Sequence, residues 1–370
     1  MRSQAPSRRS FLKLARLPAD WFLAAVLLVA LSLYLLGLSW GLPNVESWMA
    51  DDISPWLPLR VGKTYLFGWH KYPFLHSWIS LFAYGPYLLF LLLSGGLDLS
   101  CYPRISEACF SDAYTQLSAL RLVSRGLSVL MALGTVYAVY CLALRLCGER
   151  GPARFAALLA ACSFGLVLYA HMGNLDVPHC FWFVLSLYFF LGVLQRGHLF
   201  DYAAFGLSAG CAIGTKEGII GAYLLTCAAI YAAHLRRELR ASGSTGLRDL
   251  LAASLDRRLL ALVGSMLIVY AVSINPFNWS GFLEHWKLWL PSQPRMAGFQ
   301  ERFFEGYLDL FRRIALDLRY AMGWPALALC VAGLFYAPWR RRWSAVLLLP
   351  ALSYVLFSIV PAKYAPMRFV

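Results

Sequence analysis

Long apolar runs separated by short polar segments are the main pattern along this chain. A helix that crosses a bilayer needs about 20 predominantly apolar residues, within a range of roughly 17 to 25. Runs close to or within this range occupy residues 21–41, 78–97, 120–146, 155–172, 177–195, 202–216, 219–235, 259–276, 322–338 and 344–360. The pattern therefore predicts an all-α polytopic membrane protein.

The positive charges indicate which of these runs cross the membrane, because cytoplasmic loops carry the excess of Lys and Arg. If every run except 78–97 crosses, the cytoplasmic segments hold 18 Lys+Arg and 6 Asp+Glu, and the outer segments hold 13 of each. If 78–97 also crosses, the later loops change sides and the cytoplasmic excess falls from +12 to +4. We therefore predict about nine crossings, with 78–97 at the outer surface or re-entrant and broken at Gly85-Pro86. One more ordinary span is the alternative.

The chain divides into a basic cytoplasmic tail, 1–20, and a transmembrane module, 21–370. The first run is too long for a signal peptide and reads as an uncleaved anchor with a cytoplasmic N-terminus. Two large outer regions follow, 42–119 and 277–321. In the second, one helical stripe is apolar, which predicts a juxtamembrane helix in the plane of the interface. The stripe consists of Phe303, Phe304, Tyr307, Leu310, Phe311, Ile314 and Leu318.

The composition fits this architecture, with 60% of residues apolar, 14% charged and a mean hydropathy of +0.59. These values exclude an ordinary soluble enzyme and a disordered chain. The net charge of +14 is assigned to cytoplasmic loops and not to nucleic-acid binding. The nine cysteines are scattered as small apolar residues, but Cys101 and Cys109 share one polar loop and can form a disulfide if that loop is exported.

Acidic side chains at a membrane edge are costly and are therefore candidates for function. Asp51 and Asp52 follow the first span by about ten residues, and Asp176 lies in a tight turn between two spans. The alternative for the pair is a solvated loop. The alternative for Asp176 is an N-cap, because Val177-Pro178 follows it.

Histidines and cations gather on the same predicted side. Together with oxygen ligands, the histidines could hold a divalent metal, although their spacing equally suits hydrogen-bonding or interfacial roles. The outer histidines are His70, His76, His171, His179 and His285. Outer cations can bind a phosphate group, and Lys216 has a simpler alternative as an internal ion pair with Glu217. The cations are Lys63, Lys71, Lys216, Arg295 and Arg368.

Five short motifs occur in an order that resembles the GT-C membrane glycosyltransferases, and family 39 in particular. These are Met49-Ala50-Asp51-Asp52, then His70-Lys71-Tyr72-Pro73-Phe74-Leu75-His76, then His171 with Asn174-Leu175-Asp176-Val177-Pro178, then Gly214-Thr215-Lys216-Glu217-Gly218, and finally Ile274-Asn275-Pro276-Phe277. The protein O-mannosyltransferases and the bacterial lipid A aminoarabinose transferases are the relatives that the motifs suggest. The resemblance covers about residues 20–370.

The resemblance implies a sugar transfer with inversion, from a polyprenyl-phosphate donor to a hydroxyl of a protein, lipid or glycan. Asp51 matches the general base, Asp52 its acidic neighbour, and Asp176 the aspartate of the second outer loop. The donor phosphate is expected at cations on the outer face, with a divalent metal possible and no nucleic acid involved. The phosphate candidates are Lys71, Lys63, Lys216 and Arg368, and the further site candidates are His70, His76, His171 and Glu217.

The chain departs from the family pattern at three places. Many relatives have Asp-Glu where this chain has Asp51-Asp52, and Tyr72-Pro73-Phe74-Leu75 replaces Lys-Pro-Pro-Leu, so Lys71 is one position out of register. Residues 363–370 resemble the entry to another span, so we expect further C-terminal helices in the full protein. Two other functions compete with sugar transfer. One is a transporter or lipid flippase, and the other is a non-catalytic scaffold. High Ala, Leu and Arg content favours a bacterial inner membrane.

Overall fold

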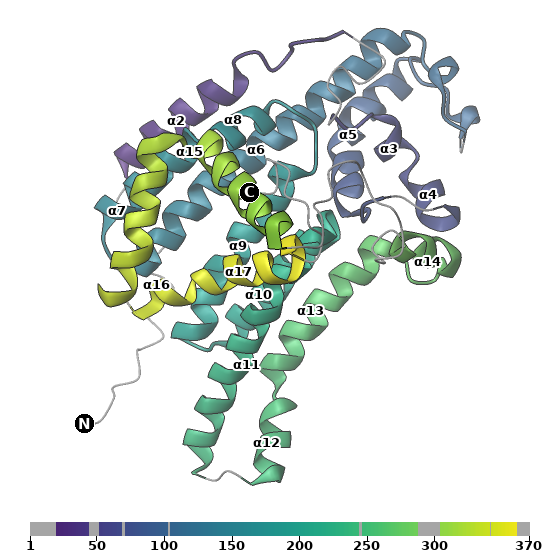
Figure 1. Cartoon of the computed structure of the whole chain (residues 1–370). Helices are drawn as coiled ribbons and strands as arrows, with labels where there is room; N and C mark the ends of the chain where they lie inside the picture. The colour runs from purple at the N-terminus through teal and green to yellow at the C-terminus, as the bar shows by residue number, and fades with distance from the viewer. Residues whose placement is uncertain are drawn as a thin grey trace.

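The computed structural model describes residues 20–43, 52–68, 71–102, 104–243, 246–287, 304–340 and 342–360. In these segments the regular structure is helical, apart from an isolated β-bridge between Leu97 and Phe110. Figure 1 shows the helices packed side by side, with α11 and α13 leading to a helical hairpin at the lower end. The predicted all-α class is confirmed.

Six described helices are long and apolar enough to cross a membrane. They are α5 (Leu75–Leu93), α6 (Ala113–Cys147), α9 (Asp176–Gln195), Glu217–Ser242 (which contains α11, Ile220–Ser242), α13 (Arg257–Ile274) and Gly306–Tyr336 within α15 (Phe304–Arg340). The pair α7 (Arg150–Ala161) and α8 (Phe164–Ala170), bent by 53°, makes a seventh if it is one span. Helix α2 (Trp21–Leu35) and the stretch Trp343–Ile359 are shorter, so the count of nine crossings stays a prediction.

Helix α5 covers the run whose crossing was in question. It is continuous through Pro86, so the predicted break at Gly85-Pro86 is wrong. A proline inside a helix removes one backbone hydrogen bond, but the helix can continue past it. At its start, the Phe74 N–H donates to Ser273 O at the end of α13 (2.7 Å). Farther along, the Tyr84 hydroxyl bonds Ser124 on α6. These contacts place the start of α5 beside the end of α13 and its middle beside α6, and the non-crossing of 78–97 stays a prediction.

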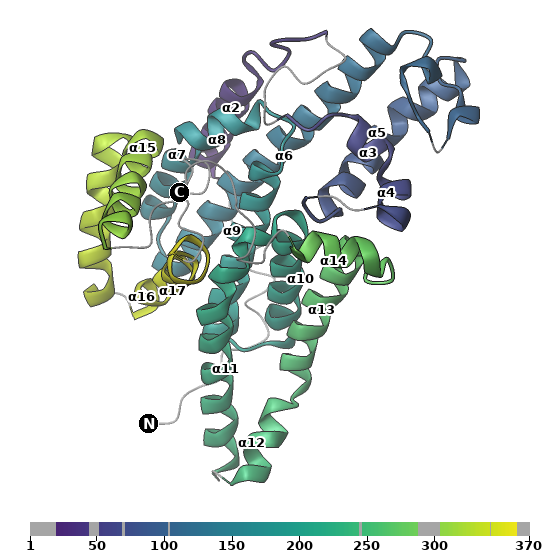
Figure 2. The same cartoon turned by 45° about the vertical axis from the view of Figure 1, so that its right-hand side comes forward.

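The two largest apolar cores of the described residues join most of the long helices. In the first, α2 packs on α7, whose alanines at positions 153, 157 and 161 are fully buried, and the Tyr34 hydroxyl donates to Ala161 O (3.1 Å). The second core joins α9, α10 (Leu199–Thr215), α11 and α13 around Phe190 and Phe205. Figure 2 shows α9, α10 and α11 side by side in the middle of the molecule.

Helices α10 and α13 approach so closely that their backbones touch. Gly206, Gly210 and Gly214 recur every fourth residue on the contacting face of α10. A Cβ added at Gly206 would lie 2.1 Å from Leu262 O, and one at Gly214 would lie 2.3 Å from Ser273 Oγ. Small residues at this spacing are the usual means by which two membrane helices pack closely.

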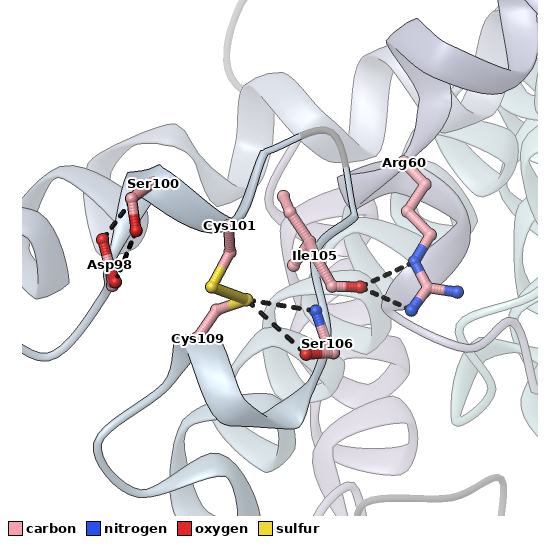
Figure 3. The surroundings of a disulfide bond; sticks show 7 residues. All are labelled: Arg60, Asp98, Ser100, Cys101, Ile105, Ser106 and Cys109. Carbon is pink, nitrogen blue, oxygen red and sulfur yellow. Dashed lines mark hydrogen bonds between the residues drawn. A yellow bond between two sulfur atoms is a disulfide. The ribbon is translucent and has the colours of Figure 1, made fainter.

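A disulfide joins Cys101 to Cys109 in the segment between α5 and α6, as the sequence allowed (Figure 3). Arg60, which lies between α3 (Trp56–Leu59) and α4 (Val61–Phe67), donates from Nε to Ile105 O inside this loop (2.9 Å). The disulfide loop is therefore attached to the segment of the short helices α3 and α4.

The predicted interfacial helix and the span after it form α15, divided by a kink at Gly323, where φ is 73° and ψ is 161°. Phe303 of the apolar stripe lies outside the described residues. Leu310 of the stripe is buried against Ile359, near the end of the segment that contains α17 (Leu348–Tyr354). Part of the stripe therefore packs on protein, where an interfacial position was expected.

Candidate active site

Asp52 and Arg125 form the centre of a buried junction. Arg125 Nη2 donates to Asp52 Oδ2 (2.9 Å), and the Gly173 N–H donates to Asp52 Oδ1 (2.7 Å). Arg125 Nη1 also donates to Leu38 O (2.7 Å) and Trp40 O (2.9 Å), just after α2. One ion pair therefore joins the residues just after α2, the segment before α3, α6 and the turn before α9.

The turn before α9 fits this junction only with glycine at position 173. A Cβ there would lie 2.8 Å from Ser124 Cβ and 3.3 Å from Asp52 Oδ1. The Ile53 N–H also donates to Gly173 O (3.1 Å), so the two loops are joined through backbone as well. A side chain at this position would collide first with Ser124 of α6 and would also crowd the Asp52 carboxylate.

Two arginines on α6 lie at this level, and sequence analysis did not select either as a site residue. Arg121 and Arg125 are one helical turn apart, and both are buried. Two charges at positions i and i+4 inside an apolar run were the signal, because charges in a membrane helix usually have a polar partner or a function. The sequence could not identify that partner, since Asp52 is 73 positions away from Arg125.

Asp176 is the first residue of α9 and pairs with Lys216, which directly follows α10. Asn174 Nδ2 donates to Asp176 Oδ2 (3.1 Å), and the Asp176 N–H donates to Asn174 Oδ1 (3.1 Å). Leu175 occupies the N-cap position, so the alternative of Asp176 as the N-cap is wrong. The Asp176 carboxylate is therefore paired with Lys216, which is 40 positions away in the sequence.

The ammonium groups of Lys71 and Lys216 lie near the same aromatic ring. Lys71 Nζ is 5.3 Å and Lys216 Nζ is 5.8 Å from the centre of the Tyr72 ring. An aromatic face attracts cations at such distances. The motif at 70–76 and the motif at 214–218 therefore meet in the fold.

Glu217 points away from Lys216 and forms a second buried cluster. The Tyr270 hydroxyl donates to Glu217 Oε1 (2.5 Å), and His285 Nε2 lies 2.5 Å from Glu217 Oε2. The alternative of an internal Lys216–Glu217 ion pair is therefore wrong. Lys216 has an extended backbone (φ −156°, ψ 109°), which directs successive side chains to opposite sides.

The remaining site candidates take different places. His171 Nε2 contacts Leu36 O and its Nδ1 contacts Val167 O, both at 2.7 Å, so this ring ties α8 to the end of α2. His76 is buried on α5, and Lys63 is exposed on α4. Asp51, His70 and Arg368 lie outside the described residues.

No group of three or more His, Cys, Asp or Glu side chains among the described residues is arranged to hold a metal ion. The carboxylates of the site face cations and hydrogen-bond donors instead. The described part of the site therefore gives no support to the divalent metal that the sequence left possible.

A sequence model of the family described as dolichyl-phosphate-mannose-protein mannosyltransferase matches residues 114–248. This segment contains Arg125, Asp176, Lys216 and Glu217, and the match confirms the predicted resemblance to membrane glycosyltransferases. No curated protein sequence matches the chain.

Two solved structures have some similarity to this chain. The Saccharomyces cerevisiae protein O-mannosyltransferase Pmt1–Pmt2 complex, bound to the sugar donor, matches with 15% identity and a TM-score of 0.48, over 75% of this chain and 36% of that one. The Archaeoglobus fulgidus oligosaccharyltransferase in the apo form matches with 15% identity and a TM-score of 0.48, over 98% of this chain and 48% of that one. This chain thus spans between a third and a half of the length of these proteins.

Proposed function

We propose that this chain, recognised through its match over 114–248 as a membrane glycosyltransferase, moves a sugar from a polyprenyl-phosphate donor to a hydroxyl acceptor with inversion. The observation that carries the proposal is the meeting of Asp176 and Lys216, from the matched segment, with Tyr72 from the first outer region. Their place at helix ends lets a lipid tail stay in the bilayer while its phosphate reaches fixed cations.

In this proposal Asp51 is the general base. Both oxygens of its neighbour Asp52 are bound by donors, from Arg125 and Gly173, which suits a residue that positions the loop. Asp51 takes the proton of the acceptor hydroxyl as the acceptor oxygen bonds to the anomeric carbon. The bond from that carbon to the phosphate oxygen breaks, and polyprenyl phosphate leaves with the electron pair. A well-placed base contributes about 10²–10⁴-fold to the rate.

Lys216 and Lys71 are the proposed contacts of the donor phosphate. Charge-assisted hydrogen bonds from ammonium groups stabilise the negative charge that develops on the departing phosphate. Asp176 holds Lys216 in place until the phosphate arrives. Lys63 and Arg368 keep the status of sequence-based candidates, because Lys63 is exposed on α4 and Arg368 lies outside the described residues.

The placement of the acids does not favour a transporter. A transporter would place ionisable side chains near the middle of its spans. Asp176 begins α9 and Lys216 directly follows α10, so both lie at the ends of long helices, and Asp52 lies in the loop before the short helix α3. We propose that this end of the bundle faces outward and that the membrane is a bacterial inner membrane.

The test is the release of polyprenyl phosphate from lipid-linked mannose, glucose and aminoarabinose, with the wild type compared to Asp51→Asn in the full-length protein. We expect release from at least one donor, and a loss of about 100-fold or more in Asp51→Asn with unchanged thermal stability. Glu107→Gln, an exposed residue of the same outer region, is the matched control and keeps full activity. Full turnover in Asp51→Asn would move the base elsewhere, with Asp176 the next candidate. No release from any donor would contradict the proposal.

A further inference from the structure

Glu217 is only 4% exposed, and both of its carboxylate oxygens are bound by side chains from two helices farther along the chain. Tyr270 lies on α13 and His285 on α14 (Trp279–Lys287), and each approaches a different oxygen at 2.5 Å. An ionised carboxylate only accepts hydrogen bonds, so His285 Nε2–H is the donor. Each Glu217 oxygen is therefore held by one side chain, an arrangement that suits a structural role.

The turn after α13 fixes where α14 lies. Asn275 ends α13 in the left-handed conformation (φ 47°), and its Nδ2 donates to Tyr65 O on α4 (2.8 Å). Asn278 Nδ2 donates to Gly68 O, just after α4 (2.6 Å). A Cβ at Gly281 would lie 2.4 Å from the same Gly68 carbonyl oxygen, so α14 sits directly on this loop.

A small cavity lies between α14 and the motif that carries Tyr72. Its volume is about 10 Å³, which is room for about one water molecule. Tyr72, Phe74, Asn278 and His285 are among the residues that line it. The ring that faces Lys216 and the imidazole that binds Glu217 therefore line the same small space.

Lys216 and Glu217 are neighbours in the chain, and their side chains leave in opposite directions. Lys216 pairs with Asp176 at the start of α9, while Glu217 is held by α13 and α14. The Lys216 N–H also donates to Ala212 O (3.0 Å), so the backbone between the two side chains has little freedom. A shift of Glu217 must move Lys216.

We propose that His285 and Tyr270 are positioning residues, which hold Glu217 so that the Lys216 ammonium stays on Asp176, facing the donor phosphate. Helix α14, outside the segment that matches the family, thereby becomes part of the phosphate site. The effect on turnover rests on the proposed function, whereas the effect on Lys216 itself does not.

The first measurement is the acylation rate of Lys216 by an amine-reactive reagent, read by mass spectrometry on the full-length protein in detergent. Exposed Lys63 serves as the internal reference. We expect Lys216 to react slowly in the wild type and at least tenfold faster in His285→Leu, whereas His285→Gln, which can still donate, stays close to the wild type. Glu284→Gln, on the exposed face of the same helix, is the matched control.

The second measurement is the dependence of transfer on donor concentration. His285→Leu is expected to raise the donor KM about tenfold with a smaller change in kcat, and His285→Gln to restore the wild-type KM. Tyr270→Phe removes the other donor and provides an independent variant, to be used if His285→Leu elutes as an aggregate.

The outcomes separate the two proposals. Unchanged protection of Lys216 in both His285→Leu and Tyr270→Phe overturns the positioning role, whatever the activity. Faster acylation together with a raised donor KM supports it. A third outcome is faster acylation in His285→Leu with an unchanged donor KM in both His285→Leu and Lys216→Met. This outcome supports the positioning role and removes Lys216 from the proposed phosphate site.

Discussion

Asp52 and Arg125 lie 2.9 Å apart inside the protein, and each side chain is only 2% exposed. They come from segments that are far apart in the sequence, and the same arginine also binds the backbone just after α2. The pair therefore holds the segment that begins at Asp52 against α6 and the end of α2.

Breaking this pair is expected to be costly. Arg125→Met leaves a buried carboxylate without its cation, and we expect the free energy of unfolding to fall by about 3–5 kcal/mol. The double variant Asp52→Asn with Arg125→Met is expected to recover part of that loss, because no unpaired charge remains. Denaturant titration of purified protein in detergent measures each value.

The matched control is Lys287→Met, which breaks the exposed pair with Glu284, whose side chains are 55% and 50% exposed. Exposed pairs contribute about 0–1 kcal/mol. An Arg125→Met variant no less stable than Lys287→Met, or a double variant less stable than either single one, contradicts the role given to the Asp52–Arg125 pair.

The Asp176–Lys216 pair gives a prediction about catalysis. If Lys216 binds the donor phosphate, Lys216→Met raises the donor KM by about tenfold or more, since a charged hydrogen bond is lost. Arg104→Met, which removes an exposed cation of the disulfide loop, is expected to change the donor KM less than about twofold. Initial rates over a range of donor concentrations decide this, and equal effects of the two variants would argue against a special role for Lys216.

Asp20 provides a prediction about pH. The Arg154 guanidinium, with help from the Tyr140 hydroxyl and the Leu23 N–H, lowers the pKa of Asp20 from 3.8 to about 2. Because the pKa is lower in the folded state, the carboxylate stabilises the fold fully above pH 3.8, and this stabilisation is lost as the pH falls towards 2. The difference in melting temperature between wild type and Asp20→Asn should therefore shrink between pH 5 and pH 2.5. A difference that stays constant over this interval would show that Asp20 acts in another way.

The orientation of the loop after α5 can be tested with single cysteines. In a background where exposed Cys162 and Cys330 are replaced by serine, Ser111→Cys is expected to react with an impermeant thiol reagent applied to intact cells. Ser242→Cys, at the end of α11, should react only after permeabilisation. If Ser111→Cys also needs permeabilisation, the run 78–97 is a true span.

The sequence predicted well what depends on local composition. Apolar runs identified most of the long helices, and the separation of Cys101 and Cys109 in one polar loop indicated the disulfide. The kink at Gly323 separates the predicted interfacial helix from the predicted span. These features follow from the polarity of neighbouring residues, which a single sequence records.

The sequence could not predict which charged groups would meet. Lys216 and Glu217 are adjacent and of opposite sign, which favoured an ion pair between them, yet the extended backbone at Lys216 sends the two side chains apart. Arg125 lies with Arg121 inside an apolar run, and its partner Asp52 is 73 positions away in the sequence. Which charged side chains form ion pairs depends on how distant helix ends come together in the fold. The spacing of residues along the sequence does not predict this.

The glycines of α10 have a mechanical consequence for the site. Since the backbones of α10 and α13 interlock from Gly206 to Gly214, neither helix can slide along the other without a steric collision. The two helices therefore move as one rigid body. Lys216 directly follows the end of α10, and Asn275 directly follows the end of α13. Any displacement of α14 relative to Lys216 must therefore come from rotation about the backbone between Asn275 and Asn278, a hinge of four residues. A larger residue at position 206 would separate α10 from α13 and would therefore disturb both Lys216 and Asn275.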